Sequence, residues 1–237
     1  MITIQTYYLE PFIAANAKTE PLSTQWLREA ISKLIRSGQV PFEKAGADPS
    51  YFYNHDPKTE QTRIGYPLII YHYIDGVFYL VGINDGAKSL ALLAKHYKSP
   101  FSVDGVVFQG FKKVRGGGEF DLSSTAEPRL YRMTEWLPLH HKDLKAFRQT
   151  DMVAKVTELN KKLEKHITGE LGKYLAIGFE NLCATITDIT QVYPQPVIYK
   201  GYEYLAFDIR FTANVSLPPM ITLGNNKALG FGRVEPN

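Results

Sequence analysis

The stretch PLIIYHYIDGVFYLVGI, residues 67–83, constrains the fold more than any other part of the chain. Apolar, β-branched and aromatic residues fill both sides of Asp75-Gly76. An Asp-Gly pair between two such runs is a strong signal for a tight hairpin turn. The stretch therefore predicts two antiparallel strands, and a sheet that contains both of them.

The neighbouring segments extend this hairpin into a larger motif. A strand-like run at 2–13 and a helix-period run at 21–39 precede it, and a short helical run at 87–97 and a strand-like run at 103–116 follow it. The resulting order is strand, helix, strand, strand, helix, strand. This order predicts a ferredoxin-like domain, in which two helices cover one face of an antiparallel sheet.

The second half begins with a long, mostly helical region at 141–182. Its apolar residues recur at helical spacing and predict one buried stripe, formed by Met152, Val156, Leu159, Leu163 and Ile167. Its lysines lie on the other side, which is typical of a solvated face: Lys155, Lys161, Lys162 and Lys165.

Strands are expected next at 184–193 and at 197–213, the latter with a turn at Lys200-Gly201. This pattern predicts a second, reduced ferredoxin-like domain. The segment 116–128 has the composition of a linker. We therefore expect an N-terminal domain of residues 1–125 and a C-terminal domain of residues 126–237.

Charge and cysteine content limit the classes of function. The net charge is +3, too small for a general nucleic-acid binder, so any anion site has to be a local patch. Cys183 is the single cysteine, so no internal disulfide forms, and it is expected to be a small buried residue. Neither a leader peptide nor a membrane-spanning run is recognisable, which makes the cytoplasm the expected location.

The C-terminal stretch LGNNKALGFGRVEPN is rich in glycine and basic residues: Gly224, Lys227, Gly230, Gly232 and Arg233. Such a loop lets backbone amides approach a phosphate closely. A dinucleotide site would need a helix directly after the glycines, and the sequence stops five residues after Gly232. A nucleic-acid backbone is the remaining common phosphate. The alternative is a pair of tight turns that flank a packed Phe231.

His55 is the first candidate for catalysis. It lies between Asn54 and Asp56 in a polar loop with several tyrosines nearby, and Lys44 lies upstream. Histidine changes its charge near neutral pH and is therefore suited to acid–base catalysis. The alternative is a solvated histidine in a turn.

The segment FKKVRGGGEF places Lys112, Lys113 and Arg115 before three glycines. A flexible basic hairpin of this kind can embrace a phosphate backbone. The alternative is a solvated loop, and the sequence leaves both open.

The remaining histidines have simpler interpretations. His140 and His141 point apart and have no further ligand at metal-binding spacing, so a solvated loop is expected. His72 alternates with apolar residues and is expected to be half-buried. His96 and His166 lie at expected helix ends, where a cationic side chain is favourable.

Taken together, the segments resemble a known family, the CRISPR repeat-RNA endonucleases of the Cas six family, and in particular its b subtype. The similarity rests on the glycine-rich tail and on LSTQWLREAISKLI, YFYNHDP and IGYPLIIYHYIDGVFYLVGINDGAKSLALL, in that order. It covers residues 2–97 and 200–236. It implies an α+β protein with two tandem ferredoxin-like domains of the RAMP or RRM-like type.

The resemblance also implies an activity, namely cleavage of precursor CRISPR RNA within its repeats, without a metal or another cofactor. The 2′-hydroxyl attacks the scissile phosphate and leaves a 2′,3′-cyclic phosphate and a 5′-hydroxyl. The family pattern Phe-His-Asn-His corresponds to Phe-Tyr-Asn-His at 52–55. It implies His55 as the general acid or base, Tyr53 as a helper in place of the first histidine, Lys44 as phosphate countercharge and Tyr66 as a positioning residue.

The resemblance implies repeat RNA as the partner, bound through the tail and the basic segment: Gly224, Lys227, Gly230, Phe231, Gly232, Arg233, Lys112, Lys113 and Arg115. Tyr53 in place of a histidine keeps a rival open, a subunit that binds repeat RNA without cutting it. Association with other effector subunits and a homodimer also remain open, and no membrane partner is expected. A small-molecule enzyme on the same fold is a further rival, which no feature of the sequence specifically favours.

Overall fold

The structure is a computed structural model that describes residues 1–13, 21–53, 65–173, 175, 178–179, 181–193 and 195–237. Contacts divide the chain into two compact units. The first comprises Met1–Phe120 with Ala228–Gly230, and the second comprises Asp121–Lys227 with Phe231–Asn237. Within the described ranges, no helix combines the length and the apolar composition that a membrane span requires.

The first unit has a five-stranded antiparallel sheet with the order β3-β4-β1-β7, in which β8 also pairs with β1. This is the strand order of a ferredoxin-like domain, so the predicted fold class is confirmed. The elements are β1 (Ile2–Leu9), α1 (Thr24–Arg36), β3 (Ile69–Ile74), β4 (Val77–Ile83), α2 (Asp85–His96), β7 (Lys112–Lys113) and β8 (Gly118–Phe120). A small sheet joins β2 (Pro11–Ile13), β5 (Phe101–Val103) and β6 (Val106–Phe108), and two 3-10 turns span Glu43–Ala45 and Pro49–Phe52.

Local signals place the hairpin and the first helix as predicted. Asp75 and Gly76 have φ angles of 49° and 81°, and Ile74 pairs with Val77 across the turn. These positive angles are those of the turn that matches the twist of two strands. At α1, the Ser23 hydroxyl accepts a hydrogen bond from the Trp26 amide at 3.1 Å, which caps the helix start.

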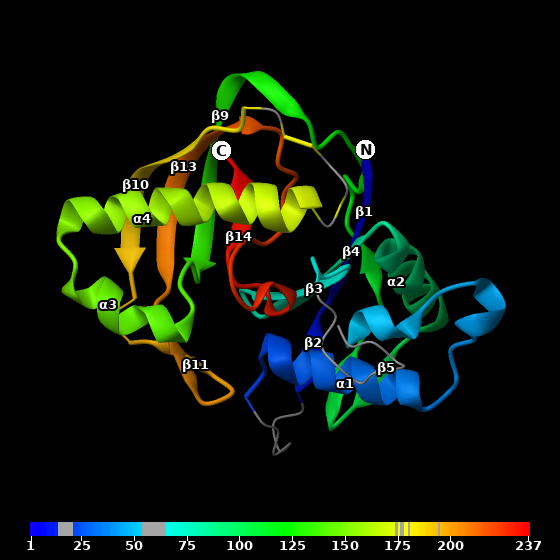
Figure 1. The fold of residues 1–237 in the computed structure, drawn as a ribbon. Coiled ribbons are helices and arrows are strands. Elements are labelled where there is room, and N and C mark those ends of the chain that lie inside the picture. Colours follow the sequence, from blue (N-terminus) through cyan, green and yellow to red (C-terminus); the bar gives the residue numbers. More distant parts are fainter. Residues whose placement is uncertain (14–20, 54–64, 174, 176–177, 180, 194) are drawn as a thin grey trace. The chain divides into compact units, whose positions relative to one another are not determined.

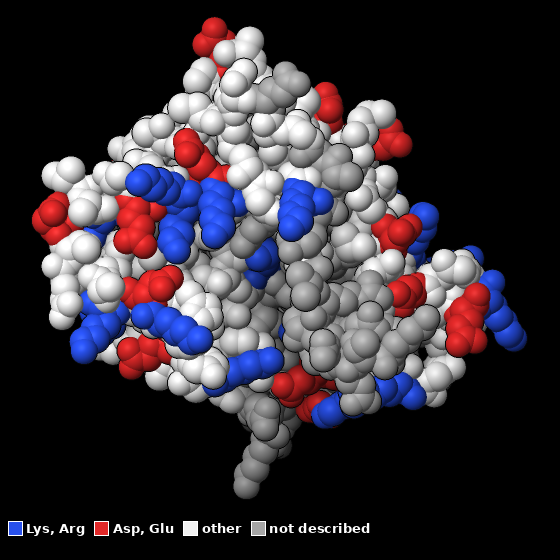
Figure 2. All heavy atoms as spheres, viewed as in Figure 1, with Lys and Arg blue, Asp and Glu red and all other residues white. Residues whose placement is uncertain are grey.

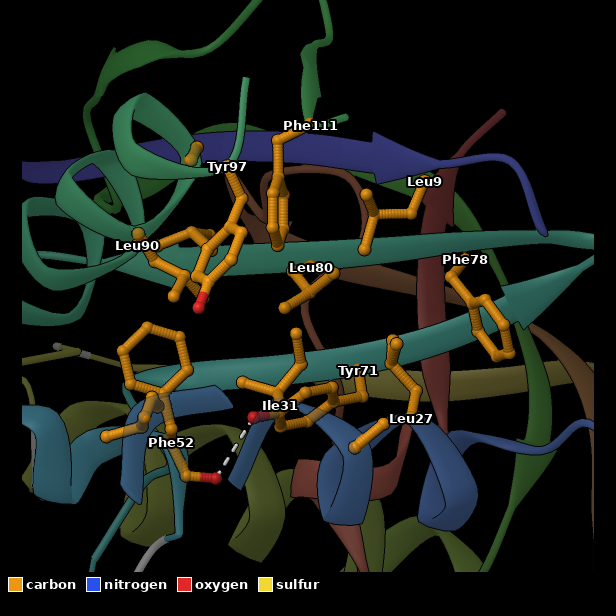
Figure 3. Close-up of a cluster of buried hydrophobic side chains, with 14 of the residues drawn as sticks. Leu9, Leu27, Ile31, Phe52, Tyr71, Phe78, Leu80, Leu90, Tyr97 and Phe111 are labelled. Carbon is orange, nitrogen blue, oxygen red and sulfur yellow. Dashed lines mark hydrogen bonds between the residues drawn. The ribbon is translucent and has the colours of Figure 1, made fainter. Parts of the chain in front are cut away.

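One face of the sheet packs against α1 and α2 (Figure 3). Side chains of both helices and of the strands point into the same cluster, and its members Leu27, Ile31, Leu80 and Leu90 are at most 1% exposed. Tyr71 lies at the centre of this core and donates a hydrogen bond from its hydroxyl to the Phe52 carbonyl at 3.0 Å. The core therefore also holds the segment that precedes the candidate catalytic loop.

The predicted strand at 103–116 is wrong in one respect. Asp104 and Gly105 have φ angles of 48° and 80°, so β5 and β6 form a hairpin there. Only Lys112–Lys113 and then Gly118–Phe120 reach the main sheet, where both segments pair with β1. The basic segment is thus an interrupted edge strand and not a separate hairpin, because its backbone pairs with β1 at Lys112–Lys113 and again from Gly118 onward.

The second unit has a four-stranded antiparallel sheet with the order β10-β13-β9-β14, covered by α4 (Figure 1). Its strands are β9 (Ser124–Trp136), β10 (Ala184–Val192), β13 (Phe207–Val215) and β14 (Arg233–Pro236), with a hairpin of β11 (Val197–Tyr199) and β12 (Tyr202–Tyr204). Its helices are a 3-10 turn (His141–Asp143), α3 (Leu144–Gln149), α4 (Met152–Lys165) and a π-helix (His166–Gly172). A further 3-10 turn (Lys227–Leu229) begins in this unit and ends in residues that are assigned to the first unit.

The predicted stripe of α4 is confirmed only in its second half. Leu159, Leu163 and Ile167 are at most 2% exposed, whereas Met152 is 71% exposed. Helical periodicity fixes the face that can be buried, but it does not fix how much of that face the sheet covers. Cys183, expected to be buried, is exposed.

The glycine-rich tail takes the place of a second helix in this unit. β13 and β14 both pair antiparallel with β9, so they run parallel to each other. A connection between parallel strands is usually an α-helix. Residues 216–232, all of which the structure describes, make this connection with a single 3-10 turn and no α-helix. The glycine-rich loop is therefore the crossover that leads into β14.

Candidate functional site

A rigidly held turn precedes the candidate catalytic loop. The Asp48 side chain accepts a hydrogen bond from the Ser50 amide at 2.8 Å, which caps the turn Pro49–Phe52. The backbone of Asp48 exchanges two hydrogen bonds with the Ser89 hydroxyl of α2, at 3.0 and 3.1 Å. These bonds fix the turn to α2, so the position of Tyr53 at its end is well defined.

Tyr53 lies at the end of this turn, beside two arginines of α1. Its carbonyl accepts a hydrogen bond from Arg28, and the guanidinium of Arg36 lies 5.9 Å from the centre of its ring. Burial raises the pKa of the Tyr53 phenol, and the charge of Arg36 offsets part of that rise. Tyr53 therefore stays protonated at neutral pH, where it can donate a hydrogen bond but cannot act as a base.

Sequence reasoning missed both arginines as neighbours of this segment. Arg28 and Arg36 are eight residues apart on α1, so they project from a similar side of the helix. This spacing in the sequence was the signal that the two arginines could act on the same neighbouring segment. They place positive charge beside Tyr53.

The other predicted catalytic residues are not gathered at Tyr53. His55 lies outside the described residues. Lys44 is exposed on the turn Glu43–Ala45 and has no hydrogen bond or ion pair within the described part of the chain. Tyr66 is only 6% exposed, so its side chain belongs to the interior. His72, expected to be half-buried, is 1% exposed on β3.

The protein's own backbone closes around the glycines of the tail. A β-carbon on Gly232 would overlap the carbonyl oxygen of Leu223, and one on Gly224 would lie 2.9 Å from that of Leu137. A β-carbon on Gly230, which belongs to the first unit, would overlap the Tyr71 carbonyl. All three glycines have positive φ angles, between 71° and 99°. The tight turns that the sequence left open as an alternative thus account for these glycines.

Hydrogen bonds hold the rest of the tail in one conformation. The Asn225 side chain donates to the carbonyls of Leu137 and Leu139, at 2.9 and 3.0 Å. The Lys227 ammonium donates to the Gly224 carbonyl at 2.9 Å, and Phe231 packs against a cluster around Leu137. The loop is preorganised by the protein itself, and its contact with RNA stays a prediction.

Gly232→Ala is expected to destabilise the second unit more than Gly38→Ala destabilises the first. Both glycines have a φ of 71°, so both variants incur the cost of a left-handed alanine, about 1–2 kcal/mol. Only Gly232 also meets a backbone oxygen, which adds about 1–3 kcal/mol, while Gly38 faces open space. Chemical unfolding of both variants measures the difference. Equal losses would show that the Leu223 contact does not constrain the loop.

The basic residues of the first unit lie at the edge of its sheet. Lys112 forms an ion pair with Glu10 at 2.7 Å and lies 5.5 Å from the centre of the Tyr8 ring. Lys113 and Arg115 are exposed. The charge of Lys112 is therefore partly neutralised, and only the other two present their charge without a recorded ion pair among the described residues.

His166 is not the cationic helix end that the sequence predicted. It is 7% exposed, and its Nδ1 accepts a hydrogen bond from the Trp136 indole at 3.2 Å. Burial, together with the smaller effect of the charges of Lys227, Lys162 and Lys165, lowers the pKa of His166 to about 3. The ring is neutral because the interior disfavours the charged form more than the helix end favours it.

The expected solvated loop at His140 and His141 is also incorrect in part. The two rings lie 4.0 Å apart, and the His141 ring stacks on Tyr202, also at 4.0 Å. Among the described residues, no group of three histidine, cysteine or acidic side chains is arranged to hold a metal ion.

Two protein-family models match this chain. The family model described as Cas6b N-terminal domain matches residues 18–109, and the one described as Cas6b C-terminal domain matches residues 123–237. No curated protein matches the chain.

Solved structures share the fold over the whole chain. One described as Cas6b has a TM-score of 0.77 at 17% identity, and a "CRISPR RNA processing endoribonuclease Cas6b" has a TM-score of 0.64 at 20% identity, each over 100% of both chains. "Csf5, CRISPR-Cas type IV Cas6 crRNA endonuclease" has a TM-score of 0.59 at 12% identity over 98% of this chain and 99% of that one. At these identities the similarity establishes the fold.

Proposed function

The chain belongs to the Cas6b family, and from that premise we propose that it is an endoribonuclease that cleaves precursor CRISPR RNA within its repeats. The observation that carries the proposal is the match of both Cas6b domains, in order, to most of the chain. The two ferredoxin-like sheets, each with the same strand order, support it.

The proposed reaction is an internal transfer at the scissile phosphate. The 2′-oxygen forms a bond to phosphorus while the bond from phosphorus to the 5′-oxygen breaks. One proton leaves the 2′-hydroxyl and one arrives at the 5′-oxygen, so the reaction needs a base and an acid. Positive charge near the phosphate stabilises the transition state. The products are a 2′,3′-cyclic phosphate and a 5′-hydroxyl, and no metal takes part.

His55 is the proposed acid or base, because it is the histidine of the segment that follows Tyr53. Tyr53 serves as a hydrogen-bond donor, since its raised pKa keeps the phenol protonated. Lys44 remains the proposed phosphate countercharge, and Arg28 and Arg36 add positive charge at the start of the segment. Because Tyr66 is buried, its proposed role is to help position the loop and not to contact RNA.

A second candidate is a protein that binds repeat RNA and does not cut it. Tyr53 favours this candidate, because it stands where the family pattern has a histidine and its raised pKa makes it a poor base. Both candidates share the fold and the partner, and they differ only in the chemical step.

The test is cleavage of a labelled repeat RNA from the host's own CRISPR array, in the presence of EDTA. Matched substrates carry a single 2′-deoxy nucleotide at each candidate position. We expect cleavage that one such substitution abolishes, because the 2′-oxygen is the nucleophile, and a 5′ product that ends in a cyclic phosphate.

Tight binding without any cleavage would establish the second candidate. Cleavage that persists in every 2′-deoxy substrate would contradict the proposed nucleophile. A requirement for added divalent metal would contradict the metal-independent reaction.

A further inference from the structure

A cleft in the second unit is lined by aromatic and charged side chains that have no role in the candidate site. It is formed by one face of α3, by His141 before that helix, and by the hairpin β11–β12. Its volume is about 460 Å³, within the range of small-ligand sites. The residues that matter for a ligand are His141, Lys145, Arg148, Tyr202 and Glu203.

Planar rings form one wall of this cleft. The His141 ring stacks on the Tyr202 ring with centres 4.0 Å apart and planes inclined by 21°. Tyr202 directly follows the tight turn at Lys200-Gly201, where φ angles of 50° and 78° are recorded, so the turn fixes its position. The residue Tyr202 is 49% exposed. About half of it is therefore left for a ligand to contact.

Two basic side chains also line this cleft. Lys145 and Arg148 are three residues apart on α3, so they project from one side of the helix, and both are exposed. Arg148 forms an ion pair with the Glu203 carboxylate at 3.8 Å, which neutralises part of its charge, whereas Lys145 has no such pair within the described part of the chain. Figure 2 shows basic side chains over the region of α3, with acidic side chains between them. The cleft thus offers two cations and one anion beside stacked rings.

Neighbouring groups keep the His141 ring neutral. Loss of solvent lowers the pKa of His141, and His140 and Lys142 lower it further, while Asp143 opposes them. A neutral ring can stack with another aromatic system without a counterion. Positive charge for an anionic ligand then comes from Lys145 and Arg148.

We propose that this cleft binds one nucleotide of a single-stranded RNA segment, with the base stacked beside Tyr202 and His141 and its phosphate at Lys145 and Arg148. Aromatic stacking next to cations is the combination that holds single strands without reading their sequence. An acidic peptide would use the cations but not the stacked rings. The inference rests on the proposed function, since it adds a subsite for the same RNA outside the candidate cleavage site.

The experiment uses the full chain and a fluorescein-labelled oligouridylate of about 12 nucleotides that contains 4-thiouridine. Photo-crosslinking followed by mass spectrometry is expected to label the peptide after Lys200, which carries Tyr202. Fluorescence anisotropy measures the affinity. Tyr202→Ala should lower it by roughly tenfold, whereas Tyr202→Phe should bind like the wild type, because stacking needs the ring and not the hydroxyl.

Charge variants test the phosphate contact. The double variant Lys145→Ala/Arg148→Ala should reduce the slope of log affinity against log salt by about 0.7, because one neutralised phosphate of a single strand contributes about 0.7. The matched control is Lys161→Ala/Lys165→Ala, which removes two exposed cations from α4 and should leave this slope unchanged. Circular dichroism and thermal unfolding verify that each variant is folded.

Two results would overturn the proposal. One is wild-type affinity in both Tyr202→Ala and the Lys145/Arg148 variant. The other is a crosslink map without the Tyr202 peptide, including the case in which the wild type does not bind the oligouridylate. Cleavage of repeat RNA is measured separately, so loss of the subsite with intact cleavage leaves the proposed function standing.

Discussion

We expect His55→Ala to slow cleavage of repeat RNA by about 10²–10⁴-fold, the usual contribution of one acid–base group, while RNA affinity stays within about twofold. The reason is that Tyr53 cannot replace it. Burial raises the pKa of that phenol, so the segment 52–55 holds one side chain that changes charge near neutral pH. Single-turnover kinetics under saturating enzyme separate the chemical step from binding.

The matched control is His96→Ala, which removes an exposed histidine from the end of α2 and should leave the rate unchanged. Cleavage at the wild-type rate by His55→Ala would exclude His55 as the acid or base. A loss of binding equal to the loss of rate would assign His55 to RNA contact instead, because a group that acts only in the transition state lowers the rate alone.

The sequence predicted those parts of the fold that neighbouring residues determine. Asp75-Gly76 specifies its turn through the backbone angles that only a few residue types tolerate. Ser23 caps α1 through a bond three residues away. The two sheets then follow from the order of elements, since short connections leave few ways to arrange them.

Contacts between distant residues determine what the sequence alone does not predict. His166 is a helix-end histidine in sequence, but burial keeps it neutral in the fold, where it accepts a hydrogen bond from Trp136, 30 residues earlier. The glycines of the tail are also typical of a phosphate loop in sequence. In the fold, two of these positions require glycine because the carbonyls of Leu223 and Leu137 occupy the space that a side chain would need.

The candidate site was predictable only in part, for the same reason. The family pattern identifies Tyr53 and His55 as neighbours along the chain. It does not show that Arg28 and Arg36 come from α1 to meet this segment, because helix packing sets that contact. The burial of Tyr66 is likewise a property of the folded core.

The buried His166 should make the second unit unusually sensitive to acid. Its pKa is about 6.5 when unfolded and about 3 when folded, so between these values the unfolded chain binds a proton that the folded ring does not. The free energy of unfolding should therefore fall as the pH drops below about 6.5, by up to about 1.4 kcal/mol per pH unit for this group. The decline from His166 should end near pH 3, after a loss of roughly 5 kcal/mol.

Guanidinium unfolding at a series of pH values measures this effect in a Trp26→Phe background, where Trp136 is the only tryptophan and reports on the second unit. His166→Gln should be less stable at pH 7, because it loses packing, but its stability should decline less steeply with acid. Carboxyl groups titrate alike in both proteins, so the difference between the two curves isolates His166.

His96→Gln, which alters an exposed histidine, should keep the wild-type slope. Parallel curves for wild type and His166→Gln would mean that His166 accepts a proton in the folded state, and Trp136 would then not be bonded to a neutral ring.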